Sequence, residues 1–322
     1  MRRTMTGTGI GSMPGEDLAE TLRIVLDTVG DLPFVPELPA RGAPAGMIGR
    51  SGAMLDGLGL DLQPAGWRFT PAPGLDHRRA RSLLARDLDL VEELAHGHVG
   101  RFKQQVAGPW TLAAMIERPL GDKVLADHGA RRELAESLAE GLGGQIADLR
   151  RRLPDAQIVV QVDEPALPAV LGAGVPTASG FSRHRAVHPP EVDAALRMVT
   201  EAIRRAGATP VVHVCAAEVP VALLAGAGFA AISFDQGLAR PTDVWAEIFE
   251  SGVDLWPGVV PSTDADLSDR VLRGRVDAFF DRMGFGEDSR QGRVVVTPTC
   301  GLAGASPAHA AAALTTAARL TT

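Results

Sequence analysis

The sequence is poor in cysteine, in excess positive charge and in long apolar runs. Two cysteines, Cys215 and Cys300, in 322 residues are too few for a disulfide framework in a chain of this size. Acidic residues outnumber lysines and arginines by 39 to 32, and the net charge of −7 argues against a nucleic-acid partner, because phosphate binding needs a basic face. No apolar run approaches the roughly 20 residues that span a bilayer, so we expect no membrane partner.

The first 18 residues also lack a feature of targeting segments. They begin with arginines but contain no apolar stretch of the kind found in a secretory signal. Together with the scarcity of cysteine, this predicts a reducing, cytoplasmic location in which both thiols are available for chemistry. Hydrophobic residues make up 45% of the chain and no low-complexity tract interrupts it, which predicts a globular fold with a sizeable core.

Eight short apolar runs alternate with amphipathic segments along the chain. Most runs are rich in β-branched residues and bounded by Gly or Pro, as buried parallel strands are. The predicted strands are residues 7–12, 32–37, 101–108, 158–165, 210–215, 229–235, 253–260 and 294–301. The predicted helices are residues 16–29, 76–98, 111–153 (as two helices), 190–206, 219–227, 242–251, 268–283 and 307–320.

This alternation predicts an α/β protein. Strands that alternate with helices form parallel sheets, and eight of them predict a single (β/α)8 TIM barrel over residues 1–322. Such a barrel typically needs about 250 residues, so we expect insertions after strands 2 and 4, at residues 38–75 and 166–189. An open doubly wound sheet is the competing fold. Its dinucleotide-binding version has no support, because no G-x-G-x-x-G turn follows a strand.

Polar and metal-binding residues gather where the predicted strands end, and active sites of barrels lie at the C-terminal ends of the strands. These residues are Ser12, Glu37, Asp163, Glu164, His213, Cys215, Asp235, Trp256 and Cys300. His213 and Cys215 are two residues apart and therefore share a strand face. With Cys300 and Asp235 ending strands on the same side of the barrel, these four residues could bind zinc, which takes N and S ligands and sometimes O. Packing as small buried side chains is the alternative for the two cysteines.

Other polar residues give weaker signals. Asp163 and Glu164 are adjacent, so we expect only one to face the barrel mouth, and the other could cap a helix or close a loop. The glycine-rich turn around Ser12 suits a bound carboxylate or phosphate, with a plain helix cap as the alternative. Glu37, at the end of the second predicted strand, could likewise bind a ligand or have only a structural, capping role.

The remaining histidines fall into two groups. Two of them, His184 and His188, lie in the long segment after strand 4, from which a mobile lid could bring one to the mouth. Four others are expected on solvated helix faces: His96, His98, His128 and His309.

Six segments occur in the order found in a known family: "IGSMP", "QVAGPWTLA", "QVDEPAL", "HVCA", "VPST" and "TCGL". Over most of its length the chain resembles the catalytic C-terminal half of cobalamin-independent methionine synthase and its short single-barrel relatives, within the uroporphyrinogen decarboxylase-like superfamily. The resemblance implies a catalytic zinc ion (Zn2+) that binds the thiol of homocysteine. It also implies a methyl donor, either methyltetrahydrofolate or a methylated corrinoid or corrinoid protein.

The resemblance also implies roles for individual residues. The family's metal ligands fall on His213, Cys215, Asp235 and Cys300. Its amino-acid-binding positions fall on Ile10, Gly11, Ser12 and Asp163, with Glu37 as a looser match. Two departures stand out: Asp235 replaces a family glutamate, and Trp256 stands where the family has its folate-site histidine.

Two other functions fit part of this pattern. A decarboxylase of the porphyrinogen type would need clustered arginines at the mouth for its many carboxylates. The "IGSMPGEDL" turn offers none, and the cysteines would be unexplained. A non-catalytic zinc- or thiol-binding relative, which has kept the pocket and lost turnover, is favoured by the replacements at Asp235 and Trp256.

Overall fold

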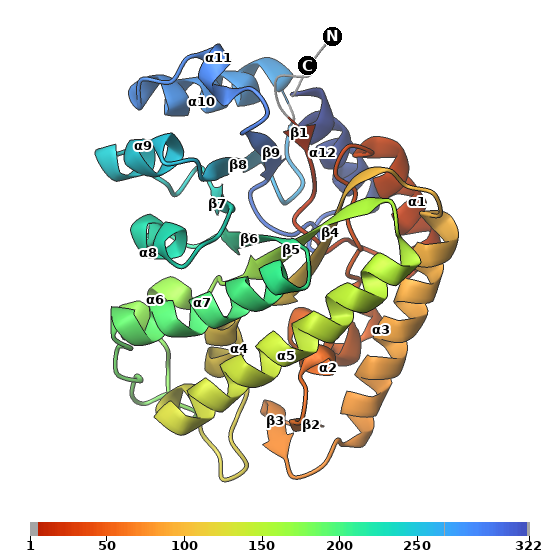
Figure 1. Cartoon of the computed structure of the whole chain (residues 1–322), viewed down its shortest axis with the longest axis vertical. Coiled ribbons are helices and arrows are strands. Elements are labelled where there is room, and N and C mark those ends of the chain that lie inside the picture. Colours follow the sequence, from red (N-terminus) through yellow and green to blue (C-terminus); the bar gives the residue numbers. More distant parts are fainter. Residues whose placement is uncertain (1–5, 267, 321–322) are drawn as a thin grey trace.

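Seven parallel strands form one curled sheet at the centre of the molecule (Figure 1). The computed structural model describes residues 6–266 and 268–320. The strands lie in the order β1 (Thr6–Gly7), β9 (Val295–Pro298), β8 (Asp254–Val260), β7 (Ala231–Asp235), β6 (Thr209–Val214), β5 (Ala156–Asp163) and β4 (Gly100–Ala107). A curled parallel sheet surrounded by helices is consistent with a TIM-like barrel.

The predicted second strand, residues 32–37, joins the sheet through single bridges. Phe34 pairs with Lys103 of β4, and Glu37 pairs with Ser12, which follows β1. The backbone N–H of Val35 donates to the carbonyl of Lys103 at 2.9 Å. This segment therefore contacts both ends of the seven-stranded sheet.

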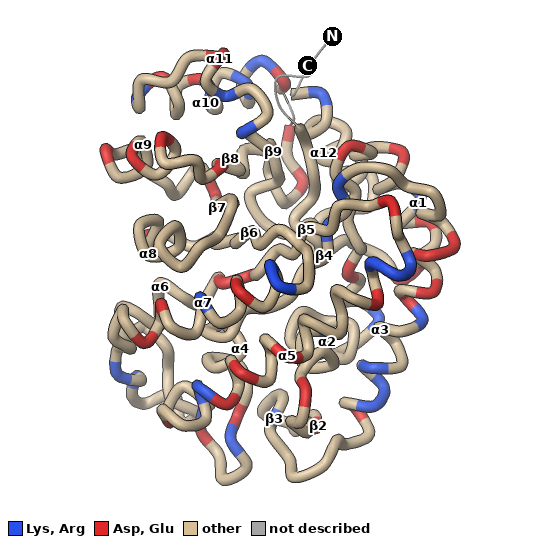
Figure 2. The backbone as a smooth tube through the Cα atoms, in the orientation of Figure 1, with Lys and Arg blue, Asp and Glu red and all other residues tan. Residues whose placement is uncertain are grey.

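Helices cover the outside of the sheet and carry many of the charged residues (Figures 1 and 2). The longer ones are α1 (Leu18–Thr28), α3 (Leu75–Leu94), α5 (His128–Arg152), α7 (Pro189–Arg205), α9 (Asp243–Glu250), α10 (Asp269–Arg282) and α12 (Pro307–Arg319). The shorter ones are α4 (Pro109–Met115), η3 (Val124–Ala126), α6 (Leu167–Leu171), α8 (Val221–Gly226) and α11 (Glu287–Arg290). The predicted double helix over residues 111–153 corresponds to α4 and α5. Within the described residues, no helix is both long enough and apolar enough to cross a membrane.

The segments where insertions were expected contain regular structure. Residues 38–75 hold two 3-10 turns, η1 (Pro39–Arg41) and η2 (Ala43–Ala45), then α2 (Met47–Met54) and an antiparallel hairpin of β2 (Gly59–Gln63) and β3 (Gly66–Thr70). Residues 166–189 hold α6 and a loop closed by a bridge between Pro176 and Arg183.

The main hydrophobic core lies between the sheet and the helices, and a second, small apolar cluster is separate from it. Its members come from the predicted second strand and from five strands of the sheet: Leu32, Val159, Val211, Ala231, Trp256 and Val295. The expectation that Trp256 ends a strand at the mouth is wrong, because β8 continues beyond it to Val260. Trp256 is 3% exposed and fills this cluster.

Candidate metal centre and substrate pocket

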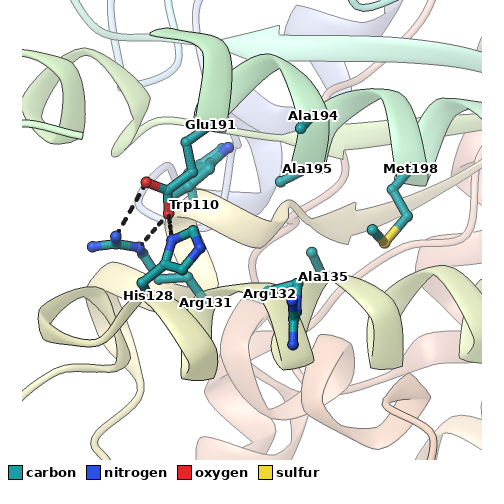
Figure 3. Close-up of a pocket in the computed structure, with 9 residues that line it drawn as sticks. All are labelled: Trp110, His128, Arg131, Arg132, Ala135, Glu191, Ala194, Ala195 and Met198. Atoms are coloured by element: carbon teal, nitrogen blue, oxygen red, sulfur yellow. Dashed lines mark hydrogen bonds and ion pairs between the residues drawn. The ribbon is translucent and has the colours of Figure 1, made fainter. Parts of the chain in front are cut away.

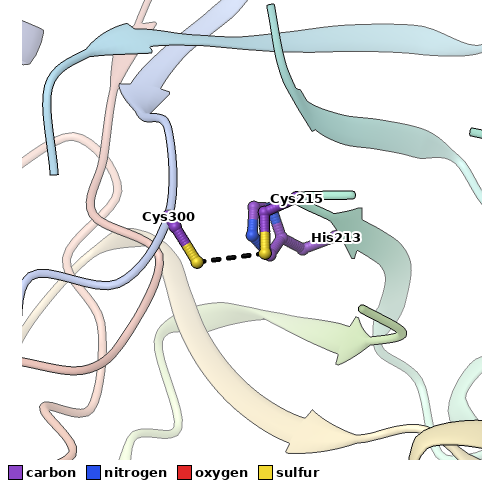
Figure 4. Close-up of side chains that lie close together, drawn as sticks. All are labelled: His213, Cys215 and Cys300. Atoms are coloured by element: carbon purple, nitrogen blue, oxygen red, sulfur yellow. Dashed lines mark hydrogen bonds between the residues drawn. The ribbon is translucent and has the colours of Figure 1, made fainter. Parts of the chain in front are cut away.

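Three metal-ligating side chains meet at the carboxyl end of the sheet (Figure 4). His213 lies near the end of β6, Cys215 directly follows that strand, and Cys300 follows β9. Their ligand atoms all lie within 4.8 Å of one another, and the two sulfur atoms are 3.0 Å apart. The structure thus brings together three of the four predicted metal ligands.

Ser233 of β7 holds the imidazole of His213. The two residues are paired in register, and the Nδ1 atom of His213 lies 2.9 Å from the Ser233 Oγ. The Nε2 atom is buried and has no hydrogen-bond partner. A histidine that binds a metal through Nε2 carries its proton on Nδ1, and the Ser233 oxygen is placed to accept that proton.

A hydrogen bond joins the two cysteines. Their hydrogen bond lowers the pKa of the Cys300 thiol to about 4, with a further contribution from His213, and raises the pKa of Cys215. The pair therefore holds one thiolate at neutral pH, which is the form of cysteine that binds metals and reacts. One nitrogen and two sulfur donors suit zinc.

Asp235, the fourth predicted ligand, lies outside this group of three. It ends β7, and its carboxylate accepts the backbone N–H of Gly237 at 2.8 Å. The charges of Cys300 and His213 act on it, and burial raises its pKa. It also lines a pocket of about 360 Å³ at the ends of β7 and β8, beside Arg275 of α10. The Asp235 carboxylate is thus close to His213 and Cys300, but it is hydrogen-bonded within the turn that follows β7.

The predicted substrate segment, Ile10–Ser12, passes beside the Cys300 turn. The backbone N–H of Leu302 donates to the carbonyl of Ser12 at 2.8 Å. A side chain at Gly301 would collide with the Ser12 hydroxyl. Ser12 is not a helix cap, because Asp17 caps α1 instead. The Ile10–Ser12 segment and the turn that carries Cys300 are therefore neighbours.

Two buried carboxylates, Glu37 and Asp163, lie near the same segment. Burial raises the pKa of both, and the charge of Glu37 raises that of Asp163 further. The amide of Gln161 donates to Asp163 at 2.7 Å, and Arg50 lies 3.9 Å from Glu37. Two neighbouring buried carboxylates of this kind would attract a cation such as an ammonium group.

The sequence comparisons decide the family. Residues 104–322 match the family model described as "Cobalamin-independent synthase, Catalytic domain". The chain belongs to this family. The metal-ligating group and Asp163 lie inside the matched region, whereas Ile10–Ser12 and Glu37 precede it.

Solved structures show the shared fold of this cobalamin-independent synthase domain. A B12-independent methionine synthase from Shewanella sp. W3-18-1, in complex with selenomethionine, matches 98% of this chain and 96% of that chain, with a TM-score of 0.64 and 13% identity. The carboxyl transferase domain of Rhizobium etli pyruvate carboxylase, with 3-bromopyruvate, covers 71% of this chain and 43% of that chain at a TM-score of 0.26 and 12% identity, too low to support an argument. No curated protein matches the sequence.

Four buried polar side chains of this synthase domain were not singled out from the sequence: Lys103, Gln105, Gln161 and Ser233. All four lie on strands. Gln161 and Ser233 stand between apolar neighbours, whereas Lys103 and Gln105 flank a third buried polar residue, Gln104, and Gln161 shares a strand face with Asp163. Polar residues within otherwise apolar strands were the available signal. Their partners depend on which strands are neighbours, and the sequence alone does not give this.

Glu164 caps a helix. Its carboxylate accepts the Thr111 N–H at 2.7 Å and the Thr111 hydroxyl at 2.8 Å, and also the N–H of Trp110, all at the start of α4. Burial raises its pKa to about 7. The expectation that only one of the two adjacent acids faces the site is confirmed, since Asp163 turns toward the substrate segment.

The other histidines do not join the metal-ligating group. His184 is buried and lies 3.2 Å from the carboxylate of Asp122 in the neighbouring loop, and His188 precedes α7. His309 was expected to be solvated, and this is wrong. It lies on the buried side of α12, 3.0 Å from the carbonyl of Pro261.

A separate pocket of about 150 Å³ lies between α5 and α7 (Figure 3). In it, Glu191 accepts a hydrogen bond from Arg131 at 2.8 Å and lies 2.9 Å from the ring of His128. Met198 and three alanines line much of the rest. Because these charged groups pair with one another, the pocket offers no catalytic group comparable to the metal-ligating one.

Proposed function

We propose that this protein is a zinc-dependent methyltransferase that moves a methyl group to the thiol of homocysteine or of a similar small amino-acid thiol. The observation that carries the proposal is the contact between the Cys300 turn and the Ile10–Ser12 segment, with Asp163 on the same side. Membership of the cobalamin-independent synthase family supports methyl transfer as the reaction.

The side chains present fit a zinc ion. Catalytic zinc sites use three protein ligands and one exchangeable position, and one histidine with two cysteines is an established ligand set. The buried, unpartnered Nε2 of His213 and the thiolate shared by Cys215 and Cys300 supply these donors. When bound, zinc lowers the pKa of a coordinated thiol so that it is a thiolate at neutral pH. Asp235 as an additional ligand is part of the proposal.

The amino-acid end of the substrate would be held by the other half of the site. Glu37 and Asp163 provide negative charge for the ammonium group, and the backbone of Ile10–Ser12 lies beside them for the carboxylate. Because Ser12 also contacts the Cys300 turn, a substrate held there has its thiol directed toward the metal ligands. Fixing both ends of the substrate in this way lowers the entropic part of the barrier.

The part of the site that would receive the methyl donor departs from the family pattern. Trp256 and its apolar neighbours form a buried cluster on the inner side of the sheet. Trp256 supplies no titratable group at the position where the family has its folate-site histidine, so the family's donor cannot be assumed for this chain. We propose either methyltetrahydrofolate or a methylated corrinoid as donor, and an assay with each distinguishes them.

Metal analysis and turnover test the proposal together. Wild-type protein purified without chelator is expected to hold about one zinc per chain, and folded Cys300→Ser protein is expected to hold much less. The wild-type protein should form methionine from homocysteine with one of the two donors. A metal-free wild type would overturn the zinc site. A zinc-loaded protein that forms methionine with neither donor would indicate a non-catalytic zinc- or thiol-binding relative.

No observation favours the porphyrinogen-type decarboxylase. The arginine nearest the acids, Arg50, is buried and pairs with Asp87 at 2.5 Å, so it is engaged rather than presented to a polycarboxylate. A single domain over residues 1–322 and a cytoplasmic location remain predictions.

A further inference from the structure

A buried lysine lies beneath the substrate segment, and the mechanism above does not use it. Lys103 on β4 is 0% exposed. Its ammonium group donates to the carbonyl of Ile10 at 2.8 Å, to the Gln161 side-chain oxygen at 2.8 Å and to the Gln105 side-chain oxygen at 3.3 Å. Lysine is almost never fully buried, because desolvating its charge is costly.

The three hydrogen bonds use all three protons of the ammonium group. Lys103 therefore has none left for a substrate, and any effect on binding must act through its partners. Each acceptor is neutral, so this is not a buried ion pair. Burial raises the pKa of Glu37 and of Asp163, and the charge of Lys103 opposes part of that rise.

Gln161 connects Lys103 to the acid pocket. Its oxygen accepts from Lys103, and its NH2 group donates to the Ile10 carbonyl at 2.8 Å, which Lys103 also contacts, and to Asp163 at 2.7 Å. A side-chain amide has one acceptor end and one donor end, and the lysine decides which end faces which partner. The carbonyl of Ile10 and the carboxylate of Asp163 are thereby fixed relative to each other.

We propose that Lys103 is a positioning residue that aims the Ile10–Ser12 segment and the Asp163 carboxylate at the amino-acid end of the substrate. The inference rests on the proposed function, since it assumes a thiol that carries ammonium and carboxylate groups. It predicts which part of a ligand depends on Lys103. The thiol end contacts the metal-ligating group, which has no hydrogen bond to Lys103, whereas the amino-acid end depends on the network.

Two thiols separate these contributions. Homocysteine carries a thiol, an ammonium and a carboxylate group, whereas 3-mercaptopropan-1-ol carries the thiol without either charge. In zinc-loaded protein, Lys103→Met should weaken homocysteine binding at least about tenfold, as expected for losing hydrogen bonds to a charged group, and change 3-mercaptopropan-1-ol binding less than about twofold. Zinc content should stay unchanged. Titration calorimetry measures both dissociation constants.

Gln104→Met is the matched control. Gln104 is the next residue of β4, is also buried and faces the other side of the strand, where it contacts Gln145. This variant should leave both thiols bound as in the wild type. Gln161→Met tests the same network with the lysine in place, so the inference stays testable if Lys103→Met fails to fold, and it should show the same selective loss for homocysteine.

Three results would overturn the inference. Equal weakening of both thiols in Lys103→Met would show a general structural role. Unchanged homocysteine binding in a folded Lys103→Met, or in Gln161→Met, would show that the network does not position the pocket. A zinc-loaded wild type that binds 3-mercaptopropan-1-ol but not homocysteine would overturn the proposed substrate, and with it the role assigned to Lys103. Because this last result concerns the wild type alone, it distinguishes failure of the proposed substrate from failure of the role assigned to Lys103.

Discussion

Replacing Ser233 by alanine should weaken zinc binding without touching a zinc ligand. Ser233 is 0% exposed, and its hydroxyl lies 2.9 Å from the Nδ1 atom of His213. Without that oxygen, the Nδ1–H group is buried and has no acceptor. The imidazole can then place its proton on Nε2, which is the atom that a metal requires to be free.

Two independent magnitudes agree on the size of the effect. Loss of a partner that orients a metal-binding histidine typically costs about 10- to 100-fold in metal affinity, which corresponds to about 1.4–2.7 kcal/mol. Leaving a buried N–H group without an acceptor costs about 1–3 kcal/mol. We therefore expect Ser233→Ala to raise the zinc dissociation constant about 10- to 100-fold.

Competition with a chromophoric zinc chelator at a fixed pH measures this change. Thr297→Val is the matched control. Thr297 lies on β9 and is also 0% exposed, but its hydroxyl has no hydrogen-bond partner, so its removal should leave zinc affinity unchanged. A Ser233→Ala affinity within twofold of the wild type would refute the reasoning. An equal loss in both variants would assign the effect to packing rather than to the hydrogen bond.

Three further outcomes follow from the same geometry. In zinc-depleted protein, the lowered pKa of Cys300 (about 4) should make its alkylation rate nearly constant between pH 6 and 8, whereas an ordinary thiol gains about tenfold per pH unit; a tenfold rise per unit would contradict the lowered pKa. Gly301→Ala should displace Ser12 and raise the KM for homocysteine more than it lowers zinc content, and an unchanged KM would count against Ser12 as part of the pocket. Glu164→Ala should lower the free energy of unfolding by about 2–4 kcal/mol, because it leaves buried donors at the start of α4 without an acceptor; urea unfolding measures this, and a loss below about 1 kcal/mol would argue against the cap.

The strands and helices of the sheet could largely be predicted from periodicity, and the exceptions have local causes. Residues 7–12 were predicted as a strand, but β1 covers only Thr6–Gly7, since the chain then turns at Gly11, whose φ of +155° lies in a region that favours glycine. Residues 32–37 contain Pro33 and Pro36, which have no N–H to donate, so this segment joins the sheet through single bridges.

The convergence of His213, Cys215 and Cys300 could be predicted, because the carboxyl ends of barrel strands meet at one mouth. That they bind a metal remains a proposal. The orientation of Asp235 could not be predicted, since it depends on the turn at Gly237 that its carboxylate caps. The network of Lys103 could not be predicted either, because two of its three partners come from the segment after β1 and from β5, and neither of these contacts is encoded locally.

The metal-ligating group also depends on the curvature of the sheet. His213 and Cys300 belong to the ends of β6 and β9, which are separated by two intervening strands. Neighbouring strands are spaced about 4.8 Å apart, so a flat sheet would hold these ends about 14 Å apart. The observed ligand atoms lie within 4.8 Å of one another, so the curl of the sheet supplies the convergence. A metal bound there would connect strands that are distant in both sheet and sequence, and its binding energy would add to the stability of the curled form. Because the Cys300 turn also contacts Ser12, the same curl of the sheet places the Ile10–Ser12 segment beside the three side chains, as the proposed substrate site requires.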